Sequence, residues 1–138
     1  MQYARAAFLN LLCLLSLSLP AQGNSLPLYI GPLALVTTQS GMEARKEIER
    51  LHGKNLDFLE GYIGSYSDGN QKAKLWISEY SSNAEAGAAT TQMAQKIRSS
   101  DQRVFWHFRE IDLEGTMVYF VVGMGQAHYF FNKGAKSV

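Results

Sequence analysis

The residues on both sides of Asp68-Gly69 alternate between two kinds of side chain, and this pattern constrains the fold more than any other part of the chain. In residues 59–66, one set of side chains alternates with another: Leu59, Gly61, Ile63 and Ser65 with Glu60, Tyr62, Gly64 and Tyr66. In residues 73–80, Ala73, Leu75 and Ile77 alternate with Lys74, Trp76, Ser78 and Tyr80. A period of two is that of a β-strand, and Asp-Gly is favoured in the tight turn between paired strands. The segment therefore predicts a β-hairpin whose turn contains Asp68-Gly69.

Two helical patterns flank this hairpin, each opened by a capping-box sequence. Ser40–Glu43 (SGME) and Ser82–Glu85 (SNAE) have a serine followed three residues later by glutamate, which together satisfy free backbone donors at a helix start. The first helix is expected from about Gly41 to Leu51, and the second over about 16 residues after Ser82. A strand over roughly residues 33–38 precedes the first helix.

The C-terminal part reads as further strands, over residues 103–113, 117–122 and 127–131, with a turn at 132–134. The whole order predicts an α+β fold: a ferredoxin-like sandwich with an antiparallel sheet, both helices on one face, and an extra C-terminal hairpin. The four residues after Gly134 are short for a strand. The tail is therefore either a sheet edge or the start of a strand whose chain continues past Val138.

Residues 1–23 have the three parts of a secretory signal peptide. Arg5 supplies the positive start, Phe8 to Leu19 are apolar, and Pro20-Ala21-Gln22-Gly23 offers small residues for cleavage. The apolar run is shorter than the roughly 20 residues that a membrane-spanning helix needs. We expect cleavage after Gly23, a single α+β domain over residues 24–138, and a periplasmic or secreted location.

The charge and cysteine content of residues 24–138 excludes several classes of function. Arg5 is the only charged residue of the signal, so the remaining chain has 12 basic and 12 acidic residues. Binding to nucleic acid or to an anionic membrane depends on clustered Lys and Arg, so neither partner is expected. Cys13 leaves with the signal, which excludes a disulfide scaffold and thiol chemistry.

Aromatic side chains of the central hairpin are the first candidate binding site. We expect Ala73, Leu75 and Ile77 to face the helices, and a second set of residues to lie together on the open face of the sheet. That set is Tyr62, Tyr66, Trp76 and Tyr80. Three explanations for such a face stay open: burial by the C-terminal strands, a symmetric dimer, or a pocket for an apolar ligand.

The stretch GMGQAHYFF, from Gly123 to Phe131, is the second candidate site. Two glycines between two strands are typical of a bent hairpin or a bulge, because glycine adopts positive φ without a steric penalty. Gln126 and His128 would then project from the rim of the sheet beside the bend. Both a structural role and a ligand-contacting rim are compatible with this pattern.

Catalytic and metal-binding motifs are not found in the sequence. His52, His107 and His128 are not spaced to meet on one helix or strand, so no metal site and no cofactor are predicted. There is no Gly-x-Ser-x-Gly elbow, and the glycines of GMGQ precede a predicted strand rather than a helix. Neither nucleophilic catalysis nor dinucleotide binding is therefore expected.

Four short stretches carry a resemblance to a known group of proteins. They are Leu51-His52-Gly53-Lys54, Leu75-Trp76-Ile77, the alanine-rich second helix, and Gly123–Gln126 followed by His128–Phe131. Together they resemble a family of exported bacterial proteins of unknown function. The resemblance implies an extracytoplasmic bacterial domain and names no activity.

The sequence as a whole favours a small exported binding or accessory domain that uses the aromatic sheet face or the Gly-rich rim. Its expected partner is a protein or a small apolar ligand, and a homodimer is among the arrangements that would cover the face. The alternative is an enzyme of the dimeric α+β-barrel type, or a haem- or metal-binding protein, with its pocket between the helices and the sheet.

Overall fold

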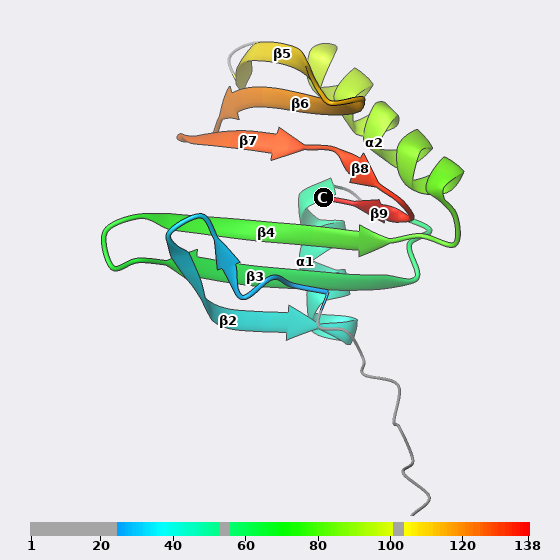
Figure 1. Cartoon of the computed structure of the whole chain (residues 1–138). Coiled ribbons are helices and arrows are strands. Elements are labelled where there is room, and N and C mark those ends of the chain that lie inside the picture. Colours follow the sequence, from blue (N-terminus) through cyan, green and yellow to red (C-terminus); the bar gives the residue numbers. More distant parts are fainter. Residues whose placement is uncertain (1–24, 53–55, 101–103) are drawn as a thin grey trace, which may run out of the picture.

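The computed structural model describes residues 25–52, 56–100 and 104–138, and within them the chain forms two helices and nine strands (Figure 1). The predicted signal peptide lies outside the described residues. The first helix is α1 (Gly41–His52) and the second is α2 (Asn83–Arg98). The strands are β1 (Tyr29–Ile30), β2 (Leu33–Ser40), β3 (Glu60–Ser67), β4 (Lys72–Glu79), β5 (Phe105–Leu113), β6 (Thr116–Gly123), β7 (Gln126–Phe130), β8 (Asn132–Lys133) and β9 (Lys136–Ser137).

The strands form two sheets, and every pairing in them is antiparallel. The larger sheet has the order β1-β2-β3-β4-β9-β8, and the smaller has the order β5-β6-β7. Strands β7 and β8 are separated by Phe131 alone, whose backbone exchanges hydrogen bonds of 3.0 and 2.8 Å with Val138. One run of extended chain therefore leaves the smaller sheet and enters the larger one.

Helix α2 packs against both sheets, along which Figure 1 shows it running. Its first half lies over β8 and β9, where the buried hydroxyls of Thr90 and Ser137 are 2.9 Å apart. Its second half contributes Ala94 to a core cluster with Val121 and Phe130 of the smaller sheet. The helix thus joins the two sheets through its opposite halves.

Helix α1 covers the larger sheet by burying Ala44 and Ile48 against Ile63 of β3. Ala86 of α2 belongs to the same cluster, so both helices pack on one side of this sheet. No helix among the residues that the structure describes is long and apolar enough to cross a membrane.

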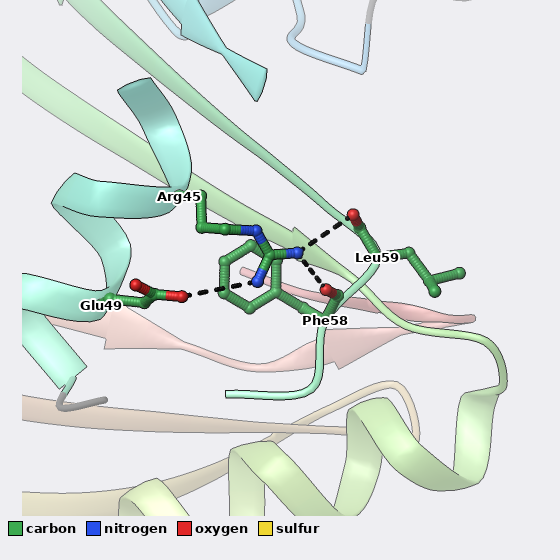
Figure 2. A network of polar contacts seen from close by, with 4 residues as sticks. All are labelled: Arg45, Glu49, Phe58 and Leu59. Atoms are coloured by element: carbon green, nitrogen blue, oxygen red, sulfur yellow. Dashed lines mark hydrogen bonds and ion pairs between the residues drawn. The ribbon is translucent and has the colours of Figure 1, made fainter. Parts of the chain in front are cut away.

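Arg45 ties α1 to the segment that leads into β3 (Figure 2). Its guanidinium donates hydrogen bonds to the carbonyl oxygens of Phe58 at 2.5 Å and Leu59 at 3.3 Å. The same group lies 4.1 Å from the centre of the Phe58 ring and 3.5 Å from a carboxylate oxygen of Glu49. One cation therefore holds an otherwise irregular stretch of backbone in place, by hydrogen bonds, stacking and charge.

The two predicted helix caps have different outcomes. The Ser82 hydroxyl accepts a hydrogen bond from the backbone N–H of Glu85 at 3.1 Å, as predicted, while the Glu85 carboxylate accepts from Ser81. At α1, no hydrogen bond between Ser40 and Glu43 is present among the described residues, and Gly41 begins the helix with a φ of 59°. The first capping box is therefore not formed.

The side of the larger sheet that faces away from α1 is covered by the N-terminal segment, drawn in blue in Figure 1. Lys136 donates a hydrogen bond to the Ser25 hydroxyl at 3.4 Å, and Tyr66 donates one to the carbonyl oxygen of Pro27 at 2.9 Å. Leu26 is buried, and the backbone of Leu28 accepts from Leu35 of β2. The segment consequently crosses this side of the sheet from β9 to β2.

The α+β class, the two helices and the antiparallel sheets are confirmed. The ferredoxin-like arrangement is not: β2 pairs antiparallel with β3, and β5 lies in the second sheet. The C-terminal residues are not at a sheet edge either, because β9 lies between β4 and β8.

Replacing Tyr66 with Phe tests the cover formed by the N-terminal segment. The ring stays buried but the hydrogen bond to Pro27 is lost, so we expect the free energy of unfolding to fall by about 1 kcal/mol in urea titrations. Tyr62→Phe is the matched control, since no hydrogen bond of the Tyr62 hydroxyl is present in the described part of the chain. Equal losses in both variants would show that the Pro27 contact contributes nothing.

Candidate binding surface

The expectation that Tyr62, Tyr66, Trp76 and Tyr80 share one open face is wrong. Trp76 lies directly opposite Ile63 and packs, with Tyr80, in the core cluster beneath the helices. Tyr62 lies opposite Ile77, and Tyr66 opposite Ala73, on the other side of the sheet. The rings are divided between the two sides, and only Tyr62 and Trp76 stay half-exposed. A ligand-binding role for any of the four stays a prediction.

The length of the hairpin loop is the physical reason for this division. Ser67 pairs with Lys72, so the loop contains the four residues 68–71. A loop with an even number of residues places even-numbered residues of one strand opposite odd-numbered residues of the other. Ala73, Leu75 and Ile77 therefore face the side of Tyr62 and Tyr66, not the helices as expected. Tyr66 is 1% exposed there because the N-terminal segment, not the C-terminal strands, covers it.

An exposed apolar surface does exist, on the smaller sheet and on the side that α2 leaves open. The register places Trp106 opposite Val122, Ile111 opposite Val118, and Phe120 opposite Tyr129 on this side. The Phe120 and Tyr129 rings lie 5.0 Å apart. Trp106 is 40% exposed, Ile111 37%, Leu113 56% and Tyr129 62%. We call this surface the outer apolar face; its members are Trp106, Ile111, Leu113, Phe120, Val122 and Tyr129.

A β-bulge interrupts β5 beside this face. Trp106 pairs with Val122 and Arg109 with Phe120, so two residues of β5 stand opposite the single residue Val121. His107, the first of the two, is exposed and has a φ of 58°, which is uncommon for a residue with a side chain. Phe108, the second, turns inward, with its ring 6.0 Å from that of Tyr119.

A cleft of about 400 Å³ lies at the bulge, between the end of α2 and β5. Its wall includes Arg98, whose guanidinium lies 4.9 Å from the centre of the Phe108 ring and forms an ion pair with Glu110. His107 and Arg109 line the cleft from β5. The surroundings are cationic and aromatic, but Arg98 already has a carboxylate partner. Sequence reasoning left this site out because the bulge has no glycine to mark it.

The stretch GMGQAHYFF forms a tight hairpin between β6 and β7. Gly123 pairs with Gln126 across a turn in which Met124 and Gly125 have φ angles of 52° and 75°, as two-residue hairpin turns require. Gly123 is needed for a different reason. A Cβ atom at this position would lie 2.3 Å from Cδ1 of Phe105 and 2.7 Å from the carbonyl oxygen of Val104.

Gln126 and His128 lie on the α2 side of the smaller sheet, away from the outer apolar face. His128 pairs with Val121, its Nε2 donates a hydrogen bond to the Gly123 carbonyl oxygen at 3.0 Å, and its ring packs edge-on against Phe105. Gln126 is exposed. The geometry gives His128 a structural contact, and ligand binding by either residue stays a prediction.

A second, smaller cavity of about 80 Å³ lies between the end of α1, α2 and the larger sheet. His52, Lys96 and Tyr80 are among its lining residues. Burial, and then the charge of Lys96, lower the pKa of His52, while burial and then Asp57 raise the pKa of Tyr80. Both groups are therefore held neutral at pH 7.

The three histidines lie at separate places, at the end of α1, at the bulge and on β7. Over residues 25–52, 56–100 and 104–138, no three His, Cys, Asp or Glu side chains are grouped closely enough to hold a metal ion.

Replacing Gly123 with Ala tests the close approach of β5 to the hairpin. The new methyl group would overlap the Phe105 ring and the Val104 backbone, so we expect a loss of about 1–3 kcal/mol of stability in urea titrations. The matched control is Gly87→Ala in α2, where the nearest atom to a new Cβ outside the helix backbone would be Nδ2 of Asn132, 3.7 Å away. That change should instead stabilise the protein by about 0.5–1 kcal/mol. Similar effects of the two changes would contradict the assigned contact.

The buried imidazole of His52 predicts a pH-dependent stability. Its pKa is lowered from 6.5 in the folded protein, so the unfolded chain takes up the proton first as the pH falls. The contribution of the neutral imidazole to the free energy of unfolding is fully present above pH 6.5. It is lost as the pH falls from 6.5 through the lowered pKa of the folded protein. Urea midpoints should therefore drop more between pH 7.5 and 5.5 for the wild type than for His52→Gln. If the urea midpoints of the wild type and of His52→Gln fall equally with pH, His52 has the same pKa in the folded and the unfolded chain, which would contradict the prediction.

Comparisons of the chain with protein-family models, with curated proteins and with solved structures found no match in any of the three. The function therefore has to be inferred from the chain's own geometry.

Proposed function

We propose that the chain is a small exported binding or accessory domain that attaches to a partner protein through the outer apolar face. The observation that carries this proposal is the exposure of Trp106, Ile111 and Leu113 of β5 and Tyr129 of β7 on the side opposite α2, with the half-buried Phe120 and Val122 of β6 between them. Isolated exposed apolar residues are normal, but a continuous patch usually marks a contact surface.

The chemistry of this face favours a protein partner over a small apolar ligand. Small molecules are usually held in concave sites, whereas a β-sheet offers a broad and gently twisted surface. Trp106 and Tyr129 are the residue types that most often dominate protein interfaces, and Arg109 lies beside Phe120 on the same side. A second copy of the chain, packed sheet on sheet, is one such partner.

The exported location is part of the proposal and is supported by residues 1–23, which have the charge, apolar run and small residues of a signal peptide. Mass spectrometry of the protein isolated from its host would locate the N-terminus. A first residue at position 24 is expected, and an intact Met1 would contradict export.

Lysine substitutions test the outer apolar face. We expect the double variant Leu113→Lys/Tyr129→Lys to lose most of the fluorescence of an apolar dye such as ANS, because two exposed members of the face become charged. The thermal midpoint should change little, since both side chains are largely exposed. Sedimentation velocity of the same samples would show whether a wild-type dimer is dissociated by the two charges.

The matched control is Val36→Lys/Met42→Lys, because these side chains are 64% and 68% exposed but lie on β2 and α1. This variant should keep both the dye fluorescence and the oligomeric state of the wild type. If it behaves like the face variant, or if the wild type neither binds dye nor self-associates, the outer apolar face is not a contact surface.

A further inference from the structure

The cleft at the bulge of β5 contains two guanidinium groups that are both anchored to Phe108. Arg98, at the end of α2, has its guanidinium 4.9 Å from the centre of the Phe108 ring. Arg109 donates a hydrogen bond from Nη1 to the Phe108 carbonyl oxygen at 3.1 Å. Both side chains line the cleft, so two positive charges border the same space of about 400 Å³.

The negative charge at this place does not balance the two arginines. Among the described residues, Glu110 forms an ion pair with Arg98 through a single oxygen. A guanidinium has five N–H donors, so this contact leaves most of the donors of Arg98 for other acceptors. The two side chains are 58% and 45% exposed, which makes the pair weak and open to competition by another carboxylate.

The end of α2 does not repel an anion strongly, because its carbonyl groups are already hydrogen-bonded. The negative end of a helix arises from carbonyl oxygens without a partner. Here the Gln95 carbonyl accepts from the backbone N–H of Ser99 at 3.0 Å. The Ile97 carbonyl accepts from the backbone N–H of Ser100 at 3.1 Å and from its hydroxyl at 2.6 Å. The charge that α2 contributes to the cleft is therefore that of Arg98.

Aromatic side chains form much of the remaining wall. Phe105 and Trp106 line the cleft from the start of β5, and Phe108 lines it from the bulge. Neighbouring residues of a regular strand point to opposite sides, but a bulge bends the strand and redirects its side chains. His107, also in the wall, has a φ of 58°, and strained backbone of this kind is frequent where a ligand binds.

We propose that this cleft binds a small aromatic carboxylate. The planar guanidinium fork matches a carboxylate with two parallel hydrogen bonds, and the aromatic wall matches a flat apolar ring. The volume of the cleft is within the range of small-molecule sites. The proposal goes beyond attachment to a partner protein and does not depend on it, since the guanidinium groups are not members of the outer apolar face.

Titration with benzoate, followed by NMR of the labelled protein, tests the proposal. The Nε–H signals of Arg98 and Arg109 and the indole N–H signal of Trp106 should shift together. A ligand of this size is expected to bind with a Kd of about 1 mM. Benzamide, which lacks the charge, and acetate, which lacks the ring, should each bind about tenfold more weakly. Absence of shifts with benzoate, or equal binding of either control compound, would overturn the proposal.

Replacing Arg109 with Gln tests the second guanidinium. The Kd of benzoate should rise about tenfold, because a charge-assisted hydrogen bond is lost. The matched control is Arg50→Gln, which removes the same charge from an exposed ion pair with Glu47 on α1 and should leave the Kd unchanged. Equal weakening in both variants would show that benzoate responds only to net charge, which would contradict the assigned cleft.

Replacing Glu110 with Gln tests the competition for Arg98. Loss of the ion pair frees this guanidinium, so benzoate should bind about two- to fivefold more tightly. Glu47→Gln frees Arg50 in the same way and should have no effect. Unchanged or weaker binding by Glu110→Gln would overturn the role of Arg98. The variant Leu113→Lys/Tyr129→Lys should keep the Kd of the wild type, so failure of the outer apolar face and failure of the cleft can be told apart.

Discussion

The backbone pairing of Phe131 with Val138 connects the two sheets. At this residue the chain stops pairing with β6 and starts pairing with β9, so a single extended run belongs to both sheets. Helix α2 reinforces the junction because its first half packs on β9 and its second half on β6 and β7. Neither sheet could move far without breaking these contacts.

Local structure could be predicted well from the sequence. The hairpin around Asp68-Gly69, both helices and the strands after Arg103 have the expected order, because each depends on a period or a turn residue within a few positions. The division of the rings between two sides could also have been predicted. A two-residue Asp-Gly turn and the observed four-residue loop both have an even number of residues. Either loop therefore places Trp76 and Tyr62 on different sides of the sheet.

Other features depend on contacts between distant residues and leave no local pattern. The cover over Tyr66 comes from Pro27, 39 positions earlier in the chain. The passage of the chain from the smaller to the larger sheet at Phe131 depends on its pairing with Val138, and no local pattern in the sequence marks this position. An open face lined by aromatic residues was expected on β3 and β4, whereas the open side that carries exposed rings, Trp106 and Tyr129, belongs to the sheet of β5, β6 and β7.

The bulge at His107 decides which chemistry the smaller sheet presents to its surroundings. In a regular strand that starts with Phe105 facing α2, the residues that follow would alternate without interruption, with Ile111 and Leu113 inward and Glu110 and Asp112 outward. The extra residue reverses this order, so that Glu110 meets Arg98 and the aliphatic side chains face out. The bulge therefore decides which side chains this side of the sheet presents: without it the same nine residues would expose carboxylates, and with it they expose aliphatic groups.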